Sequence, residues 1–238
     1  MEIKIADTKE KVAQEFSEYF KELANSQETF NVALSGGSTP KIVFDYLAGH
    51  FGNEINWKNI HFYWGDERCV SPTDSESNYK MTVDHLLSKI QIPEGNIFRV
   101  LGENDPQEEA VRYGKILDNE LPKLNDIPQF DLVMLGMGDD GHTVSIFPDS
   151  ISLWVDTENC VVSMHPDSGQ KRVTITGKIV NNAKAIALLV TGAGKAEKVQ
   201  EIIKKEKYFA SYPASLVQPS HGQLIWFLDQ DAAMRLTN

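Results

Sequence analysis

The stretch DLVMLGMGDDGHTVSIFP (131–148) joins a short apolar run to a glycine-rich loop that carries two aspartates and a histidine. Its first part is typical of a buried strand, and helical patterns separate it from similar apolar runs elsewhere in the chain. Those other runs are NVAL (31–34), IHFYW (60–64), NIFRV (96–100), CVVSM (160–164), AIALLV (185–190) and QLIWFL (223–228). The alternation predicts an α/β fold, with a mostly parallel sheet flanked by helices on both faces. The runs exceed the needs of one minimal sheet, which leaves room for a small subsidiary sheet or lobe.

The chain is expected to open with a helix and to form one domain. Asp7 followed by Glu10 predicts a capping box, and the apolar residues after it recur at helical spacing. No repeat, low-complexity tract or linker rich in Pro, Gly or Ser marks a domain boundary. We therefore expect residues 1–238 to be a single α/β domain, with Leu121 to Gln129 as a connection inside it.

Composition argues against several classes of partner. The chain has 23 Lys and Arg against 34 Asp and Glu, a net charge of −11, and no basic block, which disfavours a nucleic-acid partner. No apolar run approaches the ~20 residues that span a bilayer, and the N-terminus lacks a signal-peptide core, so we expect no membrane partner. Cys69 and Cys160 show no metal-ligand or redox spacing, which suits a reducing compartment. The prediction is a cytoplasmic protein, either monomer or homodimer.

The loops that follow the apolar runs are the candidate binding loops, because open parallel sheets bind ligands beyond the carboxyl ends of their strands. SGGSTP (35–40) follows the first run and precedes a helical pattern. Its glycines leave backbone amides exposed beside a positive helix terminus, and Ser35, Ser38 and Thr39 add hydroxyl donors. This combination predicts a phosphate site. A tight turn capped by Ser38 or Thr39 explains the same residues equally well.

The loop TGAGKAEKV (191–199) superficially resembles a nucleotide-binding P-loop. That motif requires Gly at 189 and Ser or Thr at 196, where this chain has Leu189 and Ala196. A nucleotide P-loop is therefore excluded. Lys195, behind a glycine turn at the start of a helix, still suggests a cation directed into the cleft, and an ordinary surface lysine is the simpler alternative.

The segment WGDERCVSPTDSESNY (64–79) places an acid pair and an arginine directly after a strand. Asp66, Glu67 and Arg68 could bind sugar hydroxyls and phosphate, since a planar guanidinium suits bidentate contacts with oxyanions. A solvated charged loop with a local ion pair is the alternative. Ser75 or Ser77 is expected to cap the helix that follows.

The glycines of the first loop satisfy the dinucleotide fingerprint G-x-G-x-x-G, but the rest of the loop does not. Pro148 arrives only seven residues after Gly141, too soon for the long helix of a dinucleotide site, and Asp139 and Asp140 would repel a pyrophosphate. The fingerprint is therefore a false match.

What remains in this loop is Asp140 two residues before His142, at the end of a buried strand. Histidine exchanges protons near neutral pH, and a neighbouring carboxylate can orient its ring, so we predict that His142 is a general base. A structural histidine that hydrogen-bonds the loop is the alternative. We predict no metal site, because the other histidines show no cluster with ligand spacing.

Taken together, the motifs resemble those of one family. SGGSTP, GDERCVSPTDSESNY, LGMGDDGHTVSIFP, RVTIT with TGAGKA, and PASLVQPSHGQLIWFLDQDAA are similar, in the same order and over nearly the whole chain, to the 6-phosphogluconolactonases of the pentose phosphate pathway. That family shares a Rossmann-like α/β fold with the glucosamine-6-phosphate deaminases. The deaminases carry Glu-Pro where this chain has Phe147-Pro148, and Met-Asp-Glu-Tyr in place of Gly65-Asp66-Glu67-Arg68, so the resemblance favours the lactonases.

The resemblance implies hydrolysis of 6-phospho-D-glucono-1,5-lactone to 6-phospho-D-gluconate without a metal or an organic cofactor. It assigns the base to His142 and places the substrate phosphate on Ser35, Gly36, Gly37, Ser38 and Thr39, with cationic help from Arg68, Arg172 and Lys195.

The chemistry can also be built from the residues themselves. His142 would take a proton from water and return it to the departing ring oxygen, Asp140 would orient the imidazole, and backbone amides of the glycine loop are candidate oxyanion donors. A serine nucleophile is less favoured, since Ser145 is not in G-x-S-x-G and Ser35 belongs to the phosphate loop. Two alternatives stay open: a deaminase or isomerase of amino sugar phosphates, and a non-catalytic sugar-phosphate sensor.

Overall fold

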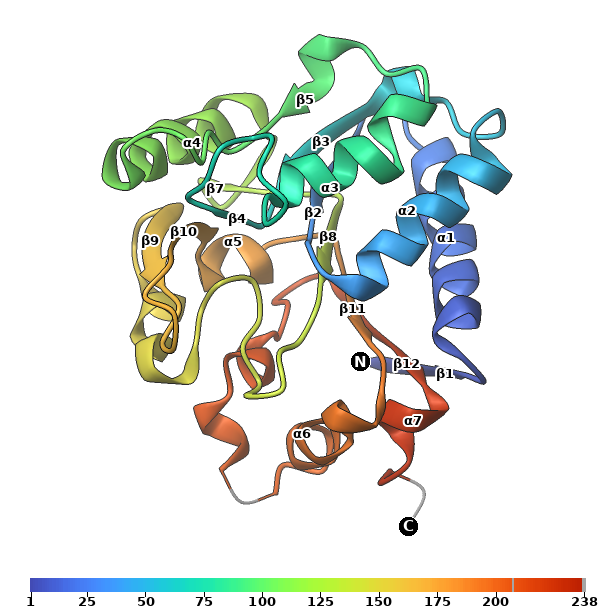
Figure 1. The fold of residues 1–238 in the computed structure, drawn as a ribbon, viewed down its shortest axis with the longest axis vertical. Coiled ribbons are helices and arrows are strands. Elements are labelled where there is room, and N and C mark those ends of the chain that lie inside the picture. The colour runs from blue at the N-terminus through green and yellow to red at the C-terminus, as the bar shows by residue number, and fades with distance from the viewer. Residues whose placement is uncertain (207, 237–238) are drawn as a thin grey trace.

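The computed structural model describes residues 1–206 and 208–236, which fold around a seven-stranded sheet (Figure 1). Every neighbouring pair of strands in this sheet is parallel. In spatial order the strands are β1 (Glu2–Ala6), β12 (Gln223–Asp229), β11 (Ala185–Val190), β8 (Leu132–Leu135), β2 (Phe30–Leu34), β3 (Ile60–Trp64) and β5 (Ile97–Phe98). The predicted parallel sheet with flanking helices is confirmed.

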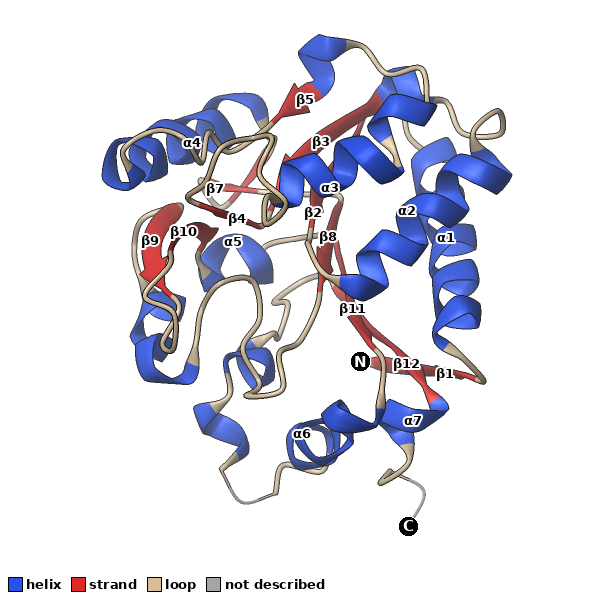
Figure 2. Cartoon of the chain, in the orientation of Figure 1, coloured by secondary structure: helices blue, strands red, loops and turns tan. Residues whose placement is uncertain are grey.

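Helices cover both faces of this sheet, with α1 and α2 on one face and α4 and α5 on the other (Figure 2). The helices are α1 (Lys9–Asn25), α2 (Ser38–Phe51), α3 (Asn78–His85), α4 (Pro106–Glu120), α5 (Gly177–Asn181), α6 (Ala196–Ile203) and α7 (Gln230–Ala233). The central strands β2, β8 and β11 are buried along their whole length, as expected for apolar runs covered on both sides. On one face, Phe16 of α1 packs edge-on against Phe227 of β12, with ring centroids 5.5 Å apart.

A second, antiparallel sheet supplies the predicted subsidiary lobe. It contains β4 (Asp66–Arg68), β10 (Lys171–Ile175) and β9 (Cys160–Met164) in that order. The apolar run at 160–164 therefore belongs to this sheet and not to the main one. A third, two-stranded sheet pairs β6 (Lys123–Leu124) with β7 (Ile127–Pro128), inside the segment expected to be a plain connection.

The beginning of the chain differs from expectation. It opens with strand β1, and the helix starts later, capped by Thr8, whose hydroxyl accepts a hydrogen bond from the Lys11 amide at 3.2 Å. The predicted cap at Asp7 was wrong by one residue. The sequence did not predict strand β1, because its charged and apolar residues alternate and do not form an apolar run. It lies at the edge of the sheet and pairs with β12, at the far end of the chain.

None of the helices in the described residues is long and apolar enough to cross a membrane.

Candidate active site

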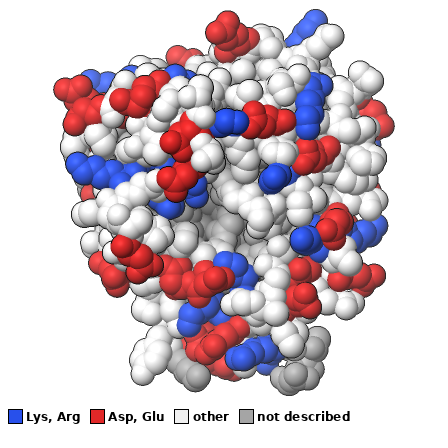
Figure 3. Space-filling view, viewed as in Figure 1, with Lys and Arg blue, Asp and Glu red and all other residues white. Residues whose placement is uncertain are grey.

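A cavity of about 220 Å³ opens at the carboxyl ends of β2, β8 and β11. The space-filling view shows this face hollowed near its centre, with Lys and Arg side chains among those around the hollow (Figure 3). All but two of the candidate residues predicted from the sequence line this cavity. The exceptions are Glu67 and Asp140. The residues that line it are Ser35, Gly36, Gly37, Ser38, Thr39, Asp66, Arg68, His142, Arg172 and Lys195. Four loops that are distant in sequence thus meet at one place, as the parallel topology predicts.

The loop SGGSTP presents the N-terminus of α2 to the cavity. Gly37 is the N-cap, with a φ of 113° that favours glycine, and no side chain caps the helix. The alternative in which Ser38 or Thr39 caps the turn is therefore wrong. The first amides of α2 remain free of a capping side chain at the positive end of the helix, an arrangement that suits an anion.

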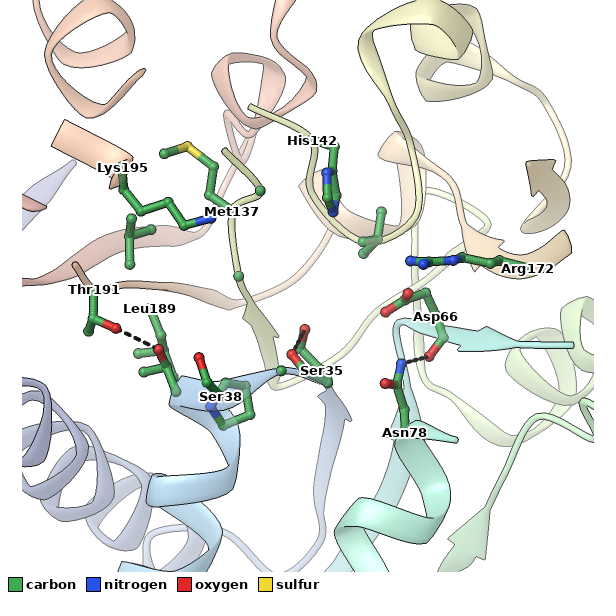
Figure 4. A pocket seen from close by; sticks show the side chains of 18 of the residues that line it. Ser35, Ser38, Asp66, Asn78, Met137, His142, Arg172, Leu189, Thr191 and Lys195 are labelled. Atoms are coloured by element: carbon green, nitrogen blue, oxygen red, sulfur yellow. Dashed lines mark hydrogen bonds between the residues drawn. The ribbon is translucent and has the colours of Figure 1, made fainter. Parts of the chain in front are cut away.

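Lys195 reaches the cavity from the loop after β11. Its Nζ lies 2.6 Å from Asp139 Oδ1 of the glycine loop, so the cation already has a carboxylate partner on the cavity rim. The loop after β11 also contacts the loop SGGSTP, through the hydroxyls of Thr191 and Thr39, which lie 2.8 Å apart. Figure 4 shows Lys195 and Arg172 on opposite sides of the cavity, with Ser35 and Ser38 between them.

Arg68 and Arg172 lie opposite each other on the neighbouring strands β4 and β10. Arg172 is only 8% exposed, and its burial together with the adjacent charge of Arg68 lowers the pKa of Arg172. Arg68 Nη1 donates to the carbonyl of Glu76 at 2.7 Å. Neither arginine has a carboxylate within 4.0 Å among the described residues, so both cations are available to an anion in the cavity.

Asp66 and Glu67 are adjacent in sequence but have different surroundings. Asp66 lines the cavity, whereas Glu67 is buried behind it. The Glu67 carboxylate accepts three backbone amides at 2.7 to 2.8 Å and the Ser77 hydroxyl at 3.0 Å. Burial raises the pKa of Glu67, and these amides oppose that rise. We expected Glu67 to contact substrate, but its contacts are those of a group that organises the start of α3, where Ser77 is the N-cap.

His142 and Asp140 form a close pair at the end of the glycine loop. His142 Nδ1 lies 2.6 Å from Asp140 Oδ1. Burial alone would raise the pKa of Asp140, but the hydrogen bond from His142 and the charge of its ring hold that pKa below its ordinary value. Because an ionised carboxylate can only accept hydrogen bonds, the hydrogen atom of this bond is on Nδ1, and in the neutral ring Nε2 is then the nitrogen that can accept a proton. The ring of His142 projects into the cavity (Figure 4).

The backbone of the glycine loop is shaped around this pair. A Cβ at Gly138 would lie 2.2 Å from His142 Nδ1, so only glycine leaves room for the ring. The Gly138 amide donates to the His142 carbonyl at 2.9 Å, and the Gly141 amide donates to the Gly138 carbonyl at 3.0 Å. The His142 amide donates to Asp140 Oδ1 at 3.1 Å. These three amides are therefore not available to an oxyanion, and the candidate donors are the other amides of the loop, including that of Met137, a residue that lines the cavity.

Phe147 packs against two of the candidate side chains, His142 and Arg172. Its ring centroid lies 4.6 Å from that of His142 and 5.6 Å from the guanidinium carbon of Arg172. Sequence reasoning used Phe147 only to separate two families, and it did not predict this contact. Asn78, which also lines the cavity and donates to the Asp66 carbonyl at 3.0 Å, was missed as well. The available signal was its position at the first residue of the helix that follows the acidic strand, ten residues after Arg68.

Within the described residues, no group of three or more His, Cys, Asp or Glu side chains is arranged to hold a metal ion. Cys69 and Cys160 are both free thiols.

Comparison with known proteins places these features in a family. Residues 4–226 match the model described as glucosamine-6-phosphate isomerases/6-phosphogluconolactonase. A 6-phosphogluconolactonase from Aggregatibacter actinomycetemcomitans is 44% identical over 229 residues, which cover 95% of this chain and 94% of the relative.

Two solved structures show how widely the fold is shared. The 6-phosphogluconolactonase of Trypanosoma brucei superposes with a TM-score of 0.86 at 26% identity, covering 99% of this chain and 98% of that one. A monomeric glucosamine-6-phosphate deaminase superposes with a TM-score of 0.82 at 22% identity, covering 98% and 99%. The second likeness concerns the fold alone, so the fold by itself does not separate the two activities.

Proposed function

The chain belongs to the glucosamine-6-phosphate isomerase/6-phosphogluconolactonase family and acts as a 6-phosphogluconolactonase, a carboxylic ester hydrolase; we propose that His142 activates the water that opens the lactone. The substrate in this proposal is 6-phospho-D-glucono-1,5-lactone and the product is 6-phospho-D-gluconate. The observation that carries the proposal is the oriented Asp140–His142 pair, whose ring faces a cavity that also contains the uncapped N-terminus of α2.

The reaction begins at Nε2 of His142. Asp140 holds the proton on Nδ1, so Nε2 accepts a proton from a water molecule as that water attacks the lactone carbonyl carbon. The tetrahedral intermediate carries its negative charge on the former carbonyl oxygen, which requires a nearby donor. When the intermediate collapses, the bond to the ring oxygen breaks, and the proton on Nε2 passes to that oxygen. Water is added across the ester and His142 returns to its starting state.

The phosphate end of the substrate positions the reacting end. In our proposal it rests on residues 35–39 at the start of α2, with Arg68, Arg172 and Lys195 supplying positive charge. Phosphate contacts remote from the reacting carbon orient the carbonyl toward His142, which is a recognised source of rate enhancement. Asp66 is left to accept a hydroxyl of the sugar. This division of roles also explains why an acidic protein gathers three cations around one cavity.

Two further assignments stay predictions, namely a single domain and a cytoplasmic location. The oligomeric state, monomer or homodimer, is left open.

The test is a coupled assay that measures formation of 6-phosphogluconate from freshly prepared lactone, read early because such lactones also open spontaneously. His142→Ala should lose most of the enzymatic rate at neutral pH and keep its fold. His221→Ala, which changes an exposed histidine, is the matched control.

A His142→Ala variant with the wild-type rate would refute the base assignment. The same preparations distinguish the alternatives. Ammonia released from glucosamine 6-phosphate would indicate a deaminase, and tight binding of 6-phosphogluconate without lactone turnover would indicate a sensor.

A further inference from the structure

A buried serine lies between two charged side chains of the cavity. Ser145 Oγ donates to Asp66 Oδ2 at 2.5 Å and accepts from Arg172 Nη1 at 3.3 Å. Ser145 is fully buried, and Asp66 and Arg172 are each more than nine-tenths buried. The three residues come from separate segments, namely β4, β10 and the loop after His142.

The serine hydroxyl connects the two charges without letting them touch. A hydroxyl donates one hydrogen bond and accepts others, so it can satisfy a carboxylate and a guanidinium together. Asp66 and Arg172 form no direct ion pair within 4.0 Å in the part of the chain that the structure describes. Asp66 lines the cavity, and its second carboxylate oxygen, Oδ1, makes no hydrogen bond with the described residues. Each charged group therefore keeps atoms available to a substrate.

The backbone around Ser145 is held in an unusual conformation. Val144 has a φ of 46°, which a β-branched residue rarely adopts and which persists only where neighbouring contacts enforce it. Those contacts are present on both sides, because the Thr143 hydroxyl donates to the Gly136 carbonyl at 2.8 Å and the Ser145 amide donates to Thr174 Oγ1 at 3.2 Å. The strained turn directs Ser145 inward while His142, three residues earlier, faces the cavity.

We infer that Ser145 is a positioning residue that holds Asp66 and Arg172 apart and correctly oriented for binding the sugar phosphate; this inference rests on the proposed function. Without the hydroxyl, the two opposite charges attract each other strongly at a site so poorly exposed to water, and they pair directly. That pairing removes the carboxylate from the sugar hydroxyls and the guanidinium from the phosphate. We do not assign Ser145 as a nucleophile, because its side chain is fully buried and does not line the cavity.

The test compares Ser145→Ala with Ser163→Ala. Ser163 is a close match because it is also buried, lies directly opposite Arg172 on β9, and its hydroxyl has no hydrogen-bond partner among the described residues. Ser145→Ala should raise KM for the lactone about 10- to 100-fold, the factor expected for losing a hydrogen bond to a charged group, with kcat changed less than about threefold. Ser163→Ala should leave KM unchanged.

Binding of 6-phosphogluconate, measured by calorimetry, provides a readout that does not depend on turnover. It should weaken for Ser145→Ala by the same factor as KM, whereas a merely structural role would leave it unchanged. Should Ser145→Ala fail to fold by circular dichroism, Ser145→Cys takes its place. Cysteine keeps the shape but is a weak donor, so affinity should again fall.

Each result bears on one claim. The inference is overturned if the folded Ser145 variant matches Ser163→Ala in KM and in product affinity, or if kcat falls while KM stays constant. Absence of lactone hydrolysis by the wild-type protein overturns the proposed function instead, and the calorimetric comparison still decides the role of Ser145.

Discussion

Replacing Asp140 by alanine should impair catalysis more than replacing it by asparagine. Asp140→Ala removes the acceptor for the Nδ1 proton and leaves the ring free to take either tautomer. Asp140→Asn keeps the shape, and its amide oxygen can take the place of Oδ1, which accepts from Nδ1 and also from the His142 backbone amide at 3.1 Å. An NH₂ group at that place would face the backbone N–H, which is also a donor, so the ring keeps its proton on Nδ1 and Nε2 can still take a proton from water.

The size of the effect follows from the geometry. The 2.6 Å distance is that of a charge-assisted hydrogen bond, which contributes about 1.5–3 kcal/mol. The side chain of Asp140 is 43% exposed, so solvent screening favours the lower value, equivalent to about tenfold in kcat for Asp140→Ala. Asp140→Asn keeps this contact as a neutral hydrogen bond, about half as strong, so its loss in kcat should be about threefold. Both losses stay well below the roughly 10⁴-fold loss known for the buried aspartate of serine proteases.

The measurement is kcat for lactone hydrolysis at neutral pH, with the spontaneous opening rate subtracted. Asp149→Asn is the control, since it changes an exposed carboxylate in the same segment of chain. KM should change little in all three variants, because Asp140 does not line the cavity. If Asp140→Asn were less active than Asp140→Ala, the tautomer argument would be wrong.

Three other predictions concern the groups around this pair. Arg172→Ala and Lys195→Ala should each raise KM about tenfold or more while kcat changes little, since each removes a charge-assisted contact with phosphate; a steady KM in steady-state kinetics would count against the phosphate assignment. Asp139→Asn should lower KM, because the Asp139 carboxylate competes with the substrate for Lys195. The decrease should be severalfold at most, since an exposed ion pair contributes up to about 1 kcal/mol. Inhibition by inorganic phosphate should become stronger in the same variant. Glu67→Gln should lower the free energy of unfolding by about 2–3 kcal/mol, or about 4–12 °C in Tm, because an amide cannot accept all the donors around Glu67; Glu28→Gln, at an exposed position, controls for the loss of charge.

Much of the architecture could be predicted because its signals are local. Apolar runs such as AIALLV mark the central strands, and parallel topology brings the loops after them together whatever their distance in sequence. The family resemblance drawn from those loops is confirmed by the match over residues 4–226. The pairing of β1 with β12 could not be predicted, since it depends on residues at the two ends of the chain.

The site itself shows where local reasoning fails. Side chains alternate across a strand, so Asp66 and Arg68 of β4 share the face toward the cavity while Glu67 points the other way. Because three consecutive charged residues are typical of a loop and not of a strand, the sequence predicted substrate contacts for Glu67 as well as for Asp66 and Arg68. The bridge through Ser145 had no sequence signal, because it depends on β4 and β10 lying side by side.

The two arginines belong to the small antiparallel sheet, whereas the histidine belongs to a loop of the large parallel one. Two of the three cations proposed to anchor the phosphate are thus carried by a scaffold separate from that of the proposed base, and this part of the anchoring could diverge independently in evolution. Sliding β10 by two residues against its neighbours would keep the same face toward the ligand and displace the guanidinium by about 6.8 Å, roughly the length of a sugar ring with one substituent. Register changes in that hairpin therefore offer a route to enzymes that accept shorter or longer sugar acids with unaltered chemistry.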